Sequence, residues 1–388
     1  MKWKKRVGET SSVIRASSDL SLRFRTTIPA GDLERVATIL RASDVFCPGP
    51  TAGDIYNWQT CRRAHADGVT IVALLDRNIL NDVVILAQTA TSDFADPLPD
   101  RARFGAAVMA YLLCCNILVD PGLAVHEWPT DALEKLTLFR RADEADASIY
   151  IDIALQRAEG FARTDLPPPK VRPSPETRWG NVSGREEHRL AVLKIAKLEL
   201  ASLSRYQKIE KFFDWTFNNY VFLPAAISLA AQQFGPRSSK RILRRVATAD
   251  RQRALSAIDN AAWDLTVAMH WAERGTKQLQ EKRFWILCSR DEALKALAKN
   301  LHFSRDAGQT REDALQTMFT ELWGVSDGRR LAARLLALMI DAKNPTRWCN
   351  QPGFEQRIAV MTHDLEEEIL AWQPSQSAEC SPRIGHMI

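Results

Sequence analysis

Four carboxylates in this sequence stand where folding could bring them to one site. Asp76 directly follows the apolar run VTIVALL, and Asp291 comes shortly after a second apolar run, RFWILC. In an open parallel sheet, sites form at the carboxyl ends of the strands, so we expect these two side chains at one edge. Asp264 is the lone acid in the apolar segment NAAWDLTVAMHWA, where a buried carboxylate needs a partner, a proton or a metal. Glu127, in GLAVHEWPTDALEKL, lies in a loop that enters another helix.

Acids that converge on one point repel each other unless a cation neutralises them. A ligand set made only of oxygen atoms suits Mg²⁺ or Mn²⁺ better than zinc. Such a site can lower the pKa of a bound water and stabilise the charge that develops on a phosphate under attack. The chemistry predicted for Asp76, Glu127, Asp264 and Asp291 is therefore metal-assisted phosphodiester hydrolysis.

A structural explanation stands beside the chemical one for three of these acids. Asp291 lies in SRDE, which could form a capping box in which its charge favours a helix N-terminus. Asp76 with Asn78 could form a strand-to-helix turn and cap. Glu127 could be an acid on a surface loop. Asp264 has the weakest structural explanation because its neighbours are apolar.

A basic segment, PRSSKRILRRVATADRQR (236–253), lies before the segment that contains Asp264. In a helix, residues four apart are neighbours, so Lys240, Arg241, Arg244 and Arg245 would share one face. Such a stripe indicates either a solvated surface helix or a surface that holds the phosphates of a nucleic acid. The formal net charge of +5 is modest for 388 residues and does not by itself indicate a nucleic-acid partner.

Two strands and many helices must position these residues. The run at 69–75 is apolar on both faces, as in a strand of a parallel sheet that is covered on both sides, and 283–288 is a second strand. The pattern predicts the α/β class, with further strands that are short. Helices are predicted at 30–43, from about 79, at 100–118, 130–161, 186–234, 254–275, 289–301 and over much of 302–388.

The predicted elements divide the chain into three parts. Residues 1–65 are expected to be an N-terminal extension. Residues 66–301 are expected to form the α/β domain, with a helical insertion at about 130–253. Residues 302–388 are expected to be a C-terminal helical region.

Composition places the chain among soluble globular proteins, since 46% of its residues are hydrophobic and 26% are charged. The longest nearly apolar run, 104–119, is shorter than a membrane-spanning helix, and no signal-peptide core follows the basic N-terminus. We therefore expect a cytoplasmic protein without a membrane span. The seven cysteines show no zinc-site spacing and are expected to be reduced.

The order and context of the four acids resemble those of the PIN-domain nucleases, a family that includes the toxin ribonucleases of bacterial toxin–antitoxin pairs. VALLDRNIL is similar to the family's opening strand with its D-x-N motif, and LAVHEW carries the internal acid. WDLTVAMHWA is similar to the buried helix with the third acid, and FWILCSRDEALKALA to the closing strand with the last. The resemblance covers residues 69–301 and implies a PIN-like parallel sheet flanked by helices.

The resemblance implies a metal-dependent ribonuclease that acts as a toxin or in defence, with RNA as its partner. Arg77 stands where the family commonly has a small residue, and it could pair with an acid or contact a phosphate. The implied catalytic acids and ligands of Mg²⁺ or Mn²⁺ are Asp76, Glu127, Asp264 and Asp291, supported through hydrogen bonds by Asn78 and Ser289. The implied RNA-binding residues are Arg77, Lys240, Arg241, Arg244 and Arg245.

Two other functions stay open. One is a non-catalytic PIN-like scaffold that binds RNA or protein. The other is a hydrolase of small phosphorylated molecules, although the sequence lacks the common phosphate-loop and nucleophile motifs. An antitoxin or other protein inhibitor and a second copy of the chain are further expected partners. Geometry separates these functions, because the nuclease requires the four carboxylates within reach of a shared metal.

Overall fold

The two apolar runs predicted as strands form the centre of a four-stranded sheet. β2 (Thr70–Leu75) and β4 (Arg283–Cys288) pair in parallel over their whole length. β3 (Leu118–Asp120) is parallel to β2, whereas β1 (Phe46–Pro48) is antiparallel to β4, so the order is β1-β4-β2-β3. The α/β class is confirmed, but the expectation of a parallel sheet is wrong at β1. A three-residue edge strand carries too little pattern to show its direction.

The computed structural model describes residues 28–48, 53–90, 97–128, 130–168, 180–219, 223–277, 281–301, 310–341 and 354–373. Helices outnumber strands throughout this part of the chain. The helices beside the sheet are α1 (Ala30–Ala42), α2 (Trp58–Ala66), α3 (Arg77–Gln88), α4 (Asp100–Cys114), α5 (Gly122–His126), α6 (Ala132–Asp143) and α7 (Ala147–Ala154). The later helices are α8 (Arg185–Leu200), α9 (Arg205–Asn219), α10 (Pro224–Phe234), α11 (Arg251–Thr276), α13 (Glu292–Leu301), α14 (Arg311–Trp323), α15 (Val325–Asp341) and α17 (Phe354–Ala371).

The described part of the expected N-terminal extension belongs to the sheet domain. β1 is a strand of the sheet, and α1 packs on α4 and α7. The hydroxyl of Tyr56, which precedes α2, accepts a hydrogen bond from the Phe46 amide of β1 at 2.9 Å. The boundary predicted at residue 65 therefore lies inside the folded unit, and the part of the prediction covering 1–27 falls outside the described residues.

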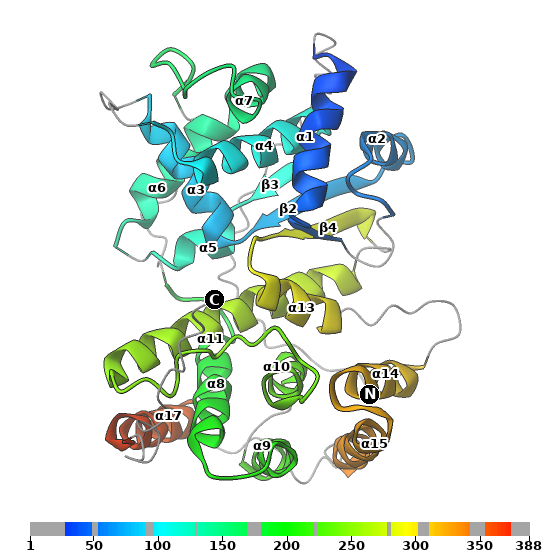
Figure 1. Cartoon of the computed structure of the whole chain (residues 1–388), viewed down its shortest axis with the longest axis vertical. Coiled ribbons are helices and arrows are strands. Elements are labelled where there is room, and N and C mark those ends of the chain that lie inside the picture. The colour runs from blue at the N-terminus through cyan, green and yellow to red at the C-terminus, as the bar shows by residue number, and fades with distance from the viewer. Residues whose placement is uncertain are drawn as a thin grey trace, which may run out of the picture.

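Alternating side chains of β2 enter two different cores. Ile71, Ala73 and Leu75 pack with α1, α3 and α4, whereas Val72 and Leu74 pack with the later helices. Side chains of a strand point alternately to its two faces, and apolar helices cover both faces here. Figure 1 shows α3 and α4 above the sheet and α11 and α13 below it. The sheet is thus the middle layer, and α11 passes directly beneath the strand ends.

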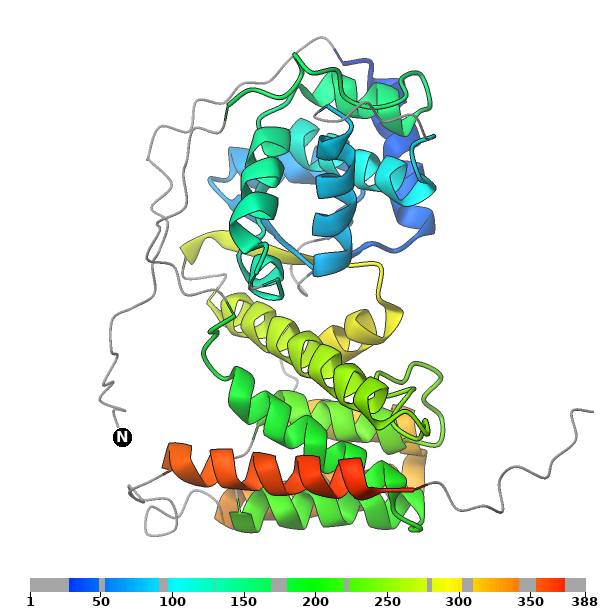
Figure 2. The ribbon, with the colours of Figure 1, turned by 90° about the vertical axis from the view of Figure 1, so that its left-hand side faces the viewer.

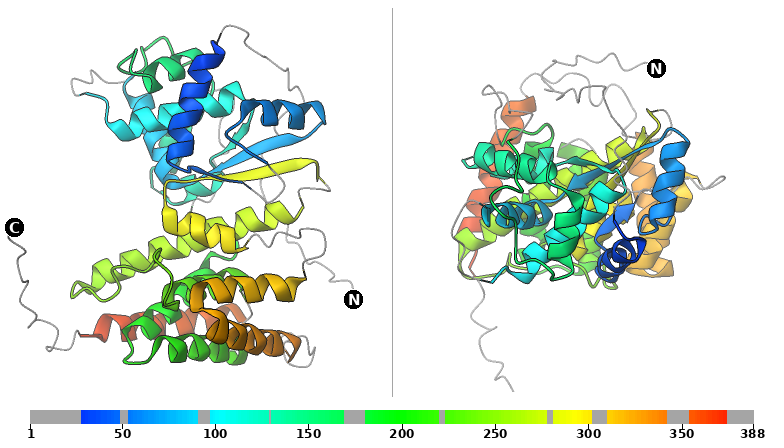
Figure 3. Two further views of the ribbon diagram at one scale, coloured as in Figure 1. Left: turned by 45° about the vertical axis from the view of Figure 1, so that its right-hand side comes forward. Right: turned by 90° about the horizontal axis from the view of Figure 1, so that it is seen from above.

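A helical half lies on the far side of α11 and α13, as Figure 2 shows. The left view of Figure 3 shows α8, α10, α14, α15 and α17 in this half, away from the sheet. The last helix, α17, packs on α8 and α11 through Ile358, Leu365 and Ile369. Ion pairs from Arg189 to Glu366 and from Lys197 to Glu368 join α8 to α17. In the described residues, no helix is long and apolar enough to cross a membrane.

A neutral histidine is buried where α8 meets α11. His188 is 4% exposed, and its Nδ1 lies 3.0 Å from the hydroxyl of Thr266. That hydroxyl donates its hydrogen to the carbonyl of Ala262, so it accepts from His188. Burial, with a smaller contribution from the charge of His270, lowers the pKa of His188 to about 4.

Acid should therefore destabilise the fold through His188. In the unfolded chain His188 binds a proton below its ordinary pKa of 6.5, whereas in the folded chain it binds one only below about pH 4. The free energy of unfolding therefore falls as pH falls from 6.5 to 4. We expect a loss of up to about 3 kcal/mol between pH 6.5 and pH 4. Urea unfolding of the wild type and of His188→Gln at several pH values measures this. The exposed His363→Gln is the control, and an unchanged pH dependence in His188→Gln would contradict the assignment.

Candidate active site

Asp76 ends β2 and begins α3. It is 5% exposed, and its Oδ1 accepts a hydrogen bond from the Arg77 amide at 2.6 Å, so it caps the helix. Its own amide donates to the carbonyl of Cys288 at 2.9 Å and continues the pairing of β2 with β4. The strand-to-helix cap considered from the sequence is therefore present, and the same geometry holds the carboxylate at the sheet edge.

A small hydrogen-bond network fixes the second oxygen of Asp76. The Ser289 hydroxyl donates to Asp76 Oδ2 at 2.6 Å, and the Asn78 amide group donates to the same oxygen. Asn78 also accepts from the Arg290 amide at 3.2 Å. The hydrogen bonds expected of Asn78 and Ser289 are present, and they tie the start of α3 to the segment after β4.

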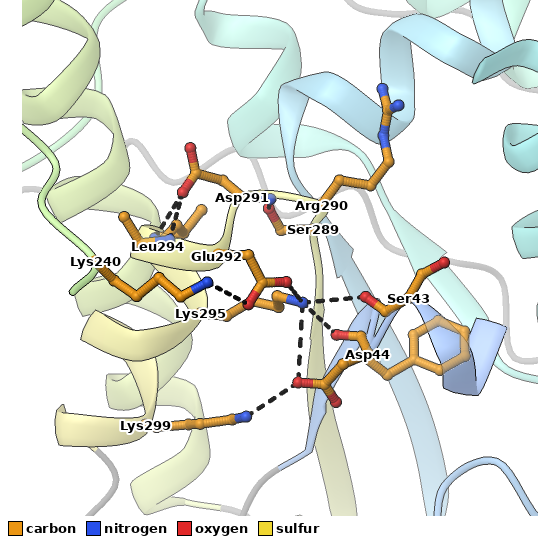
Figure 4. Close-up of polar contacts among 12 residues, drawn as sticks. Ser43, Asp44, Lys240, Ser289, Arg290, Asp291, Glu292, Leu294, Lys295 and Lys299 are labelled. Carbon is orange, nitrogen blue, oxygen red and sulfur yellow. Dashed lines mark hydrogen bonds and ion pairs between the residues drawn. The ribbon is translucent and has the colours of Figure 1, made fainter. Parts of the chain in front are cut away.

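Asp291 caps α13 at the neighbouring strand end. Its Oδ1 accepts from the amides of Ala293 at 2.7 Å and Leu294 at 3.0 Å. Ser289 supports it by accepting from the Asp291 amide at 2.9 Å. Figure 4 shows the other carboxylate oxygen of Asp291 turned away from these donors. Asp291, not Ser289, is therefore the residue whose side chain caps the helix, and one of its oxygens stays available for other contacts.

Glu127 follows α5 and is largely buried beside Arg77. Arg77 Nε lies 3.2 Å from Glu127 Oε2, so the first of the two roles considered for Arg77 is observed. Burial raises the pKa of Glu127 to about 8, the Arg77 charge acts against this, and the Asp76 charge adds to it. The surface-loop explanation of Glu127 is wrong, because 6% of its side chain is exposed.

Asp264 lies in the middle of α11, where this helix passes beneath the strand ends. Burial raises the pKa of its carboxyl well above the usual range, and the charges of Asp76, Asp291 and Glu127 raise it further. Arg77 is the positive group that opposes them. Four acids that are far apart in the sequence therefore lie near enough for their charges to act on Asp264, whereas the prediction required them within reach of a shared metal.

The four acids are not arranged as a finished metal site. Across the described ranges, no three Asp, Glu, His or Cys side chains lie in a geometry that could hold a metal ion. Asp76 is committed to three donors, and Glu127 is paired with Arg77. In chemical type the set fits a hard divalent cation, because every donor is a carboxylate and each added negative charge raises the pKa of Asp264.

A pocket of about 360 Å³ opens beside Asp264 and Asp291. Its walls come from α11, from the start of α13 and from the segment that joins α10 to α11. Asp76 and Glu127 do not line it, so two of the four acids face this space. The lining residues are Arg241, Ile242, Arg244, Asp264, Arg290, Asp291, Glu292 and Ala293.

The predicted basic helix face is absent, since residues 235–250 form turns and bends between α10 and α11. Gly235 and Pro236 follow the end of α10, and backbone groups of Lys240 and Leu243 bond to Gln232 and Gln233 of that helix. Lys240, Arg241, Arg244 and Arg245 consequently point in different directions. Arg241 and Arg244 line the pocket, Lys240 lies 3.6 Å from Glu292, and Arg245 is exposed outside the pocket lining.

Sequence reasoning missed an ion pair beside the site, between a buried acid and an exposed arginine. Asp82 of α3 is 1% exposed, and its Oδ2 lies 2.6 Å from Arg290 Nη2. Burial raises the pKa of Asp82 to about 6, and the Arg290 charge opposes this. In Figure 4 the Arg290 side chain points away from Asp291. Its place between Ser289 and Asp291 was the signal that could have drawn attention to Arg290.

A buried lysine on α13 was also missed. Lys295 is 1% exposed and donates to the carbonyls of Ser43 at 3.3 Å and Asp44 at 2.6 Å (Figure 4). Its Nζ also lies 2.5 Å from Glu292, whose carboxylate is shared with Lys240. Glu292 is thus neutralised by two lysines and does not form the capping box considered from the sequence.

Comparison with known proteins adds no relative. No protein-family model, no curated protein and no solved structure matches this chain.

Proposed function

We propose that this protein is a metal-dependent nuclease that hydrolyses phosphodiester bonds of RNA, on a PIN-like domain. The observation that carries the proposal is that Asp76, Glu127 and Asp291, from three separate places in the chain, lie near enough to Asp264 of α11 for their charges to add to the effect of burial on its pKa. Like charges that lie close together cost stability, and pKa values perturbed in this way are commonly found at functional sites. The choice of RNA rests on the resemblance of the motifs.

The four acids would together hold Mg²⁺ or Mn²⁺. A bound divalent cation supplies acidification of a water molecule and neutralisation of charge on the phosphate. Without a cation, the pKa of about 8 means that Glu127 holds a proton for much of the time at pH 7, and the pKa of Asp264 is raised as well. The acids must lose these protons when a cation binds, so apparent metal affinity should increase with pH.

The neighbouring side chains hold the acids in place. Ser289 and Asn78 fix the orientation of Asp76, because both donate to its Oδ2. Arg77 keeps Glu127 directed toward the other acids through its ion pair. If Glu127 turns to a cation, Arg77 is released and can contact a phosphate, which was its second expected role.

A non-catalytic scaffold is the second candidate, because two of the acids already have a structural role as helix caps. Asp76 caps α3 and Asp291 caps α13. This explanation does not extend to Asp264, which caps no helix and lies within α11. A scaffold would bind RNA or protein without needing the charge of Asp264.

Cleavage of labelled single-stranded RNA by the purified chain tests the proposal. We expect cleavage with Mg²⁺ or Mn²⁺, complete loss of cleavage when EDTA removes the metal, and recovery when excess metal returns. Single-stranded DNA of the same sequence measures the preference for RNA. A folded chain that binds Mn²⁺, seen by calorimetry, but cuts neither nucleic acid would contradict the nuclease and favour the scaffold.

A further inference from the structure

The pocket beside Asp264 and Asp291 has a basic wall that comes from the helical half of the chain. We propose that Arg241 and Arg244 bind one phosphate group of a nucleic-acid strand in this pocket and so place the strand against the acids. The inference rests on the proposed nuclease function, which it extends by assigning substrate positioning to the segment between α10 and α11. The acids and the arginines line the same 360 Å³ space.

Arg244 is oriented by the backbone and not by an acid. Its Nε donates to the carbonyl of Arg241 at 2.9 Å, which leaves the two terminal nitrogens of the guanidinium for another acceptor. Within the described ranges, no carboxylate forms an ion pair or hydrogen bond with Arg244. A guanidinium binds the oxygens of a phosphate in a bidentate manner, and this geometry suits such an acceptor.

Arg241 is only loosely engaged. Its nearest acid is Glu199, with 3.8 Å between Arg241 Nη1 and Glu199 Oε1, which is too long for a hydrogen bond. About one third of its side chain is exposed (32%), so it can turn toward an anion in the pocket.

The segment that carries both arginines is anchored at two points. Gln232 of α10 donates to the carbonyl of Lys240 at 2.5 Å, and Gln233 accepts from the Leu243 amide at 3.2 Å. Both glutamines are about 1% exposed, and Leu243 is buried. The backbone on each side of Arg241 is therefore held before any ligand binds, which lowers the entropy cost of binding.

The other cations near the pocket are engaged elsewhere. Lys240 forms an ion pair with Glu292, and the guanidinium of Arg290 forms one with the buried Asp82. Among the positive groups that line the pocket, Arg241 and Arg244 are therefore the ones we expect to attract an anion. A volume of about 360 Å³ is at the small end of ligand pockets and suits one nucleotide with its phosphate.

The test measures binding of a short single-stranded RNA to the full chain by fluorescence anisotropy. EDTA is present, so hydrolysis does not interfere, and salt is varied from 50 to about 200 mM. The double variant Arg241→Ala/Arg244→Ala should bind about tenfold more weakly than the wild type. Loss of one phosphate contact should also reduce the slope of log affinity against log salt by about 0.7.

Matched variants separate a positioned site from diffuse charge. Arg253→Ala removes the same charge from the exposed start of α11, outside the pocket lining, and it should bind like the wild type. Arg244→Lys should keep the salt slope and lose affinity, because lysine lacks the bidentate geometry. If the double variant does not fold, Arg244→Ala alone must show the same direction, since Arg244 is exposed. Equal losses in Arg253→Ala, or no binding by the wild type, would overturn the inference.

The bound phosphate could be terminal or internal, and oligomers with and without a 5′-phosphate distinguish them. A gain in affinity from the 5′-phosphate that requires both arginines identifies a terminal group, and equal affinity that still requires them identifies an internal one. The experiment is independent of cleavage. If the arginines behave as expected and no metal supports cleavage, only the nuclease proposal fails. If RNA is cleaved and the double variant binds normally, only this inference fails.

Discussion

Asp264→Asn should abolish RNA cleavage while leaving the fold intact and raising its stability. The carboxyl of Asp264 is partly buried at the wall of the pocket, and the negative charges of Asp76, Asp291 and Glu127 act on it. The pKa of Asp264 is raised in the folded chain. Above the ordinary pKa of 3.8, its carboxyl therefore lowers the stability of the folded chain relative to the unfolded chain. Asparagine has almost the same shape without the charge, so the free energy of unfolding at pH 7 should increase.

The loss of activity has the opposite sign from the gain in stability. A group that stabilises charge in the transition state contributes about 10²–10³-fold in rate, and we expect a loss at least this large. Initial cleavage rates and urea unfolding curves at pH 7, compared with the wild type, measure the two effects. Glu273→Gln, an exposed carboxylate on the same helix, is the matched control and should change neither. A stable Asp264→Asn chain with full activity would refute the role of the four acids.

Asp76→Ala should lose both activity and stability. Alanine removes the cap of α3 and the acceptor of the Ser289 and Asn78 donors. Ser289 is fully buried, so its hydroxyl would lose its partner without water to replace it. Leaving a buried donor unpaired costs about 1–3 kcal/mol, and losing the cap costs about 1 kcal/mol.

Asp76→Asn separates the two roles of this residue. Asparagine caps helices as well as aspartate does, so the variant should keep most of its stability and still lose cleavage. Asp146→Ala is the matched control, because Asp146 caps α7 at the other end of the sheet domain. It should lose about 1 kcal/mol of stability and keep full activity. Normal cleavage by Asp76→Asn would mean that Asp76 serves the fold alone.

The fold and the site could be predicted where the pattern lies within one short stretch of sequence. β2 and β4 are apolar on both faces, and the acids that follow them could be recognised from that position alone. Asp264 could be recognised because a charge in an apolar helix is costly. β1 and β3 could not be recognised, because a three-residue strand is defined by the strand beside it.

The site was harder to predict where its parts come from distant segments. The spacing of Arg241 and Arg244 suggested a helix, but the segment forms turns, and its backbone bonds to Gln232 and Gln233 of α10. The ion pair between Asp82 and Arg290 joins α3 to the segment after β4. The sequence around Asp82 does not indicate that its partner is Arg290. Contacts of this kind follow from the packing of whole elements.

The packing of α17 ties the site to the order in which the chain is made. α17 covers α8 and α11, and α11 carries Asp264, yet α17 lies after every other described element. During synthesis the sheet and the first three acids leave the ribosome long before this support exists. Residues 28–301, with the sheet and all four acids, therefore emerge from the ribosome before α8 and α11 gain the cover of α17.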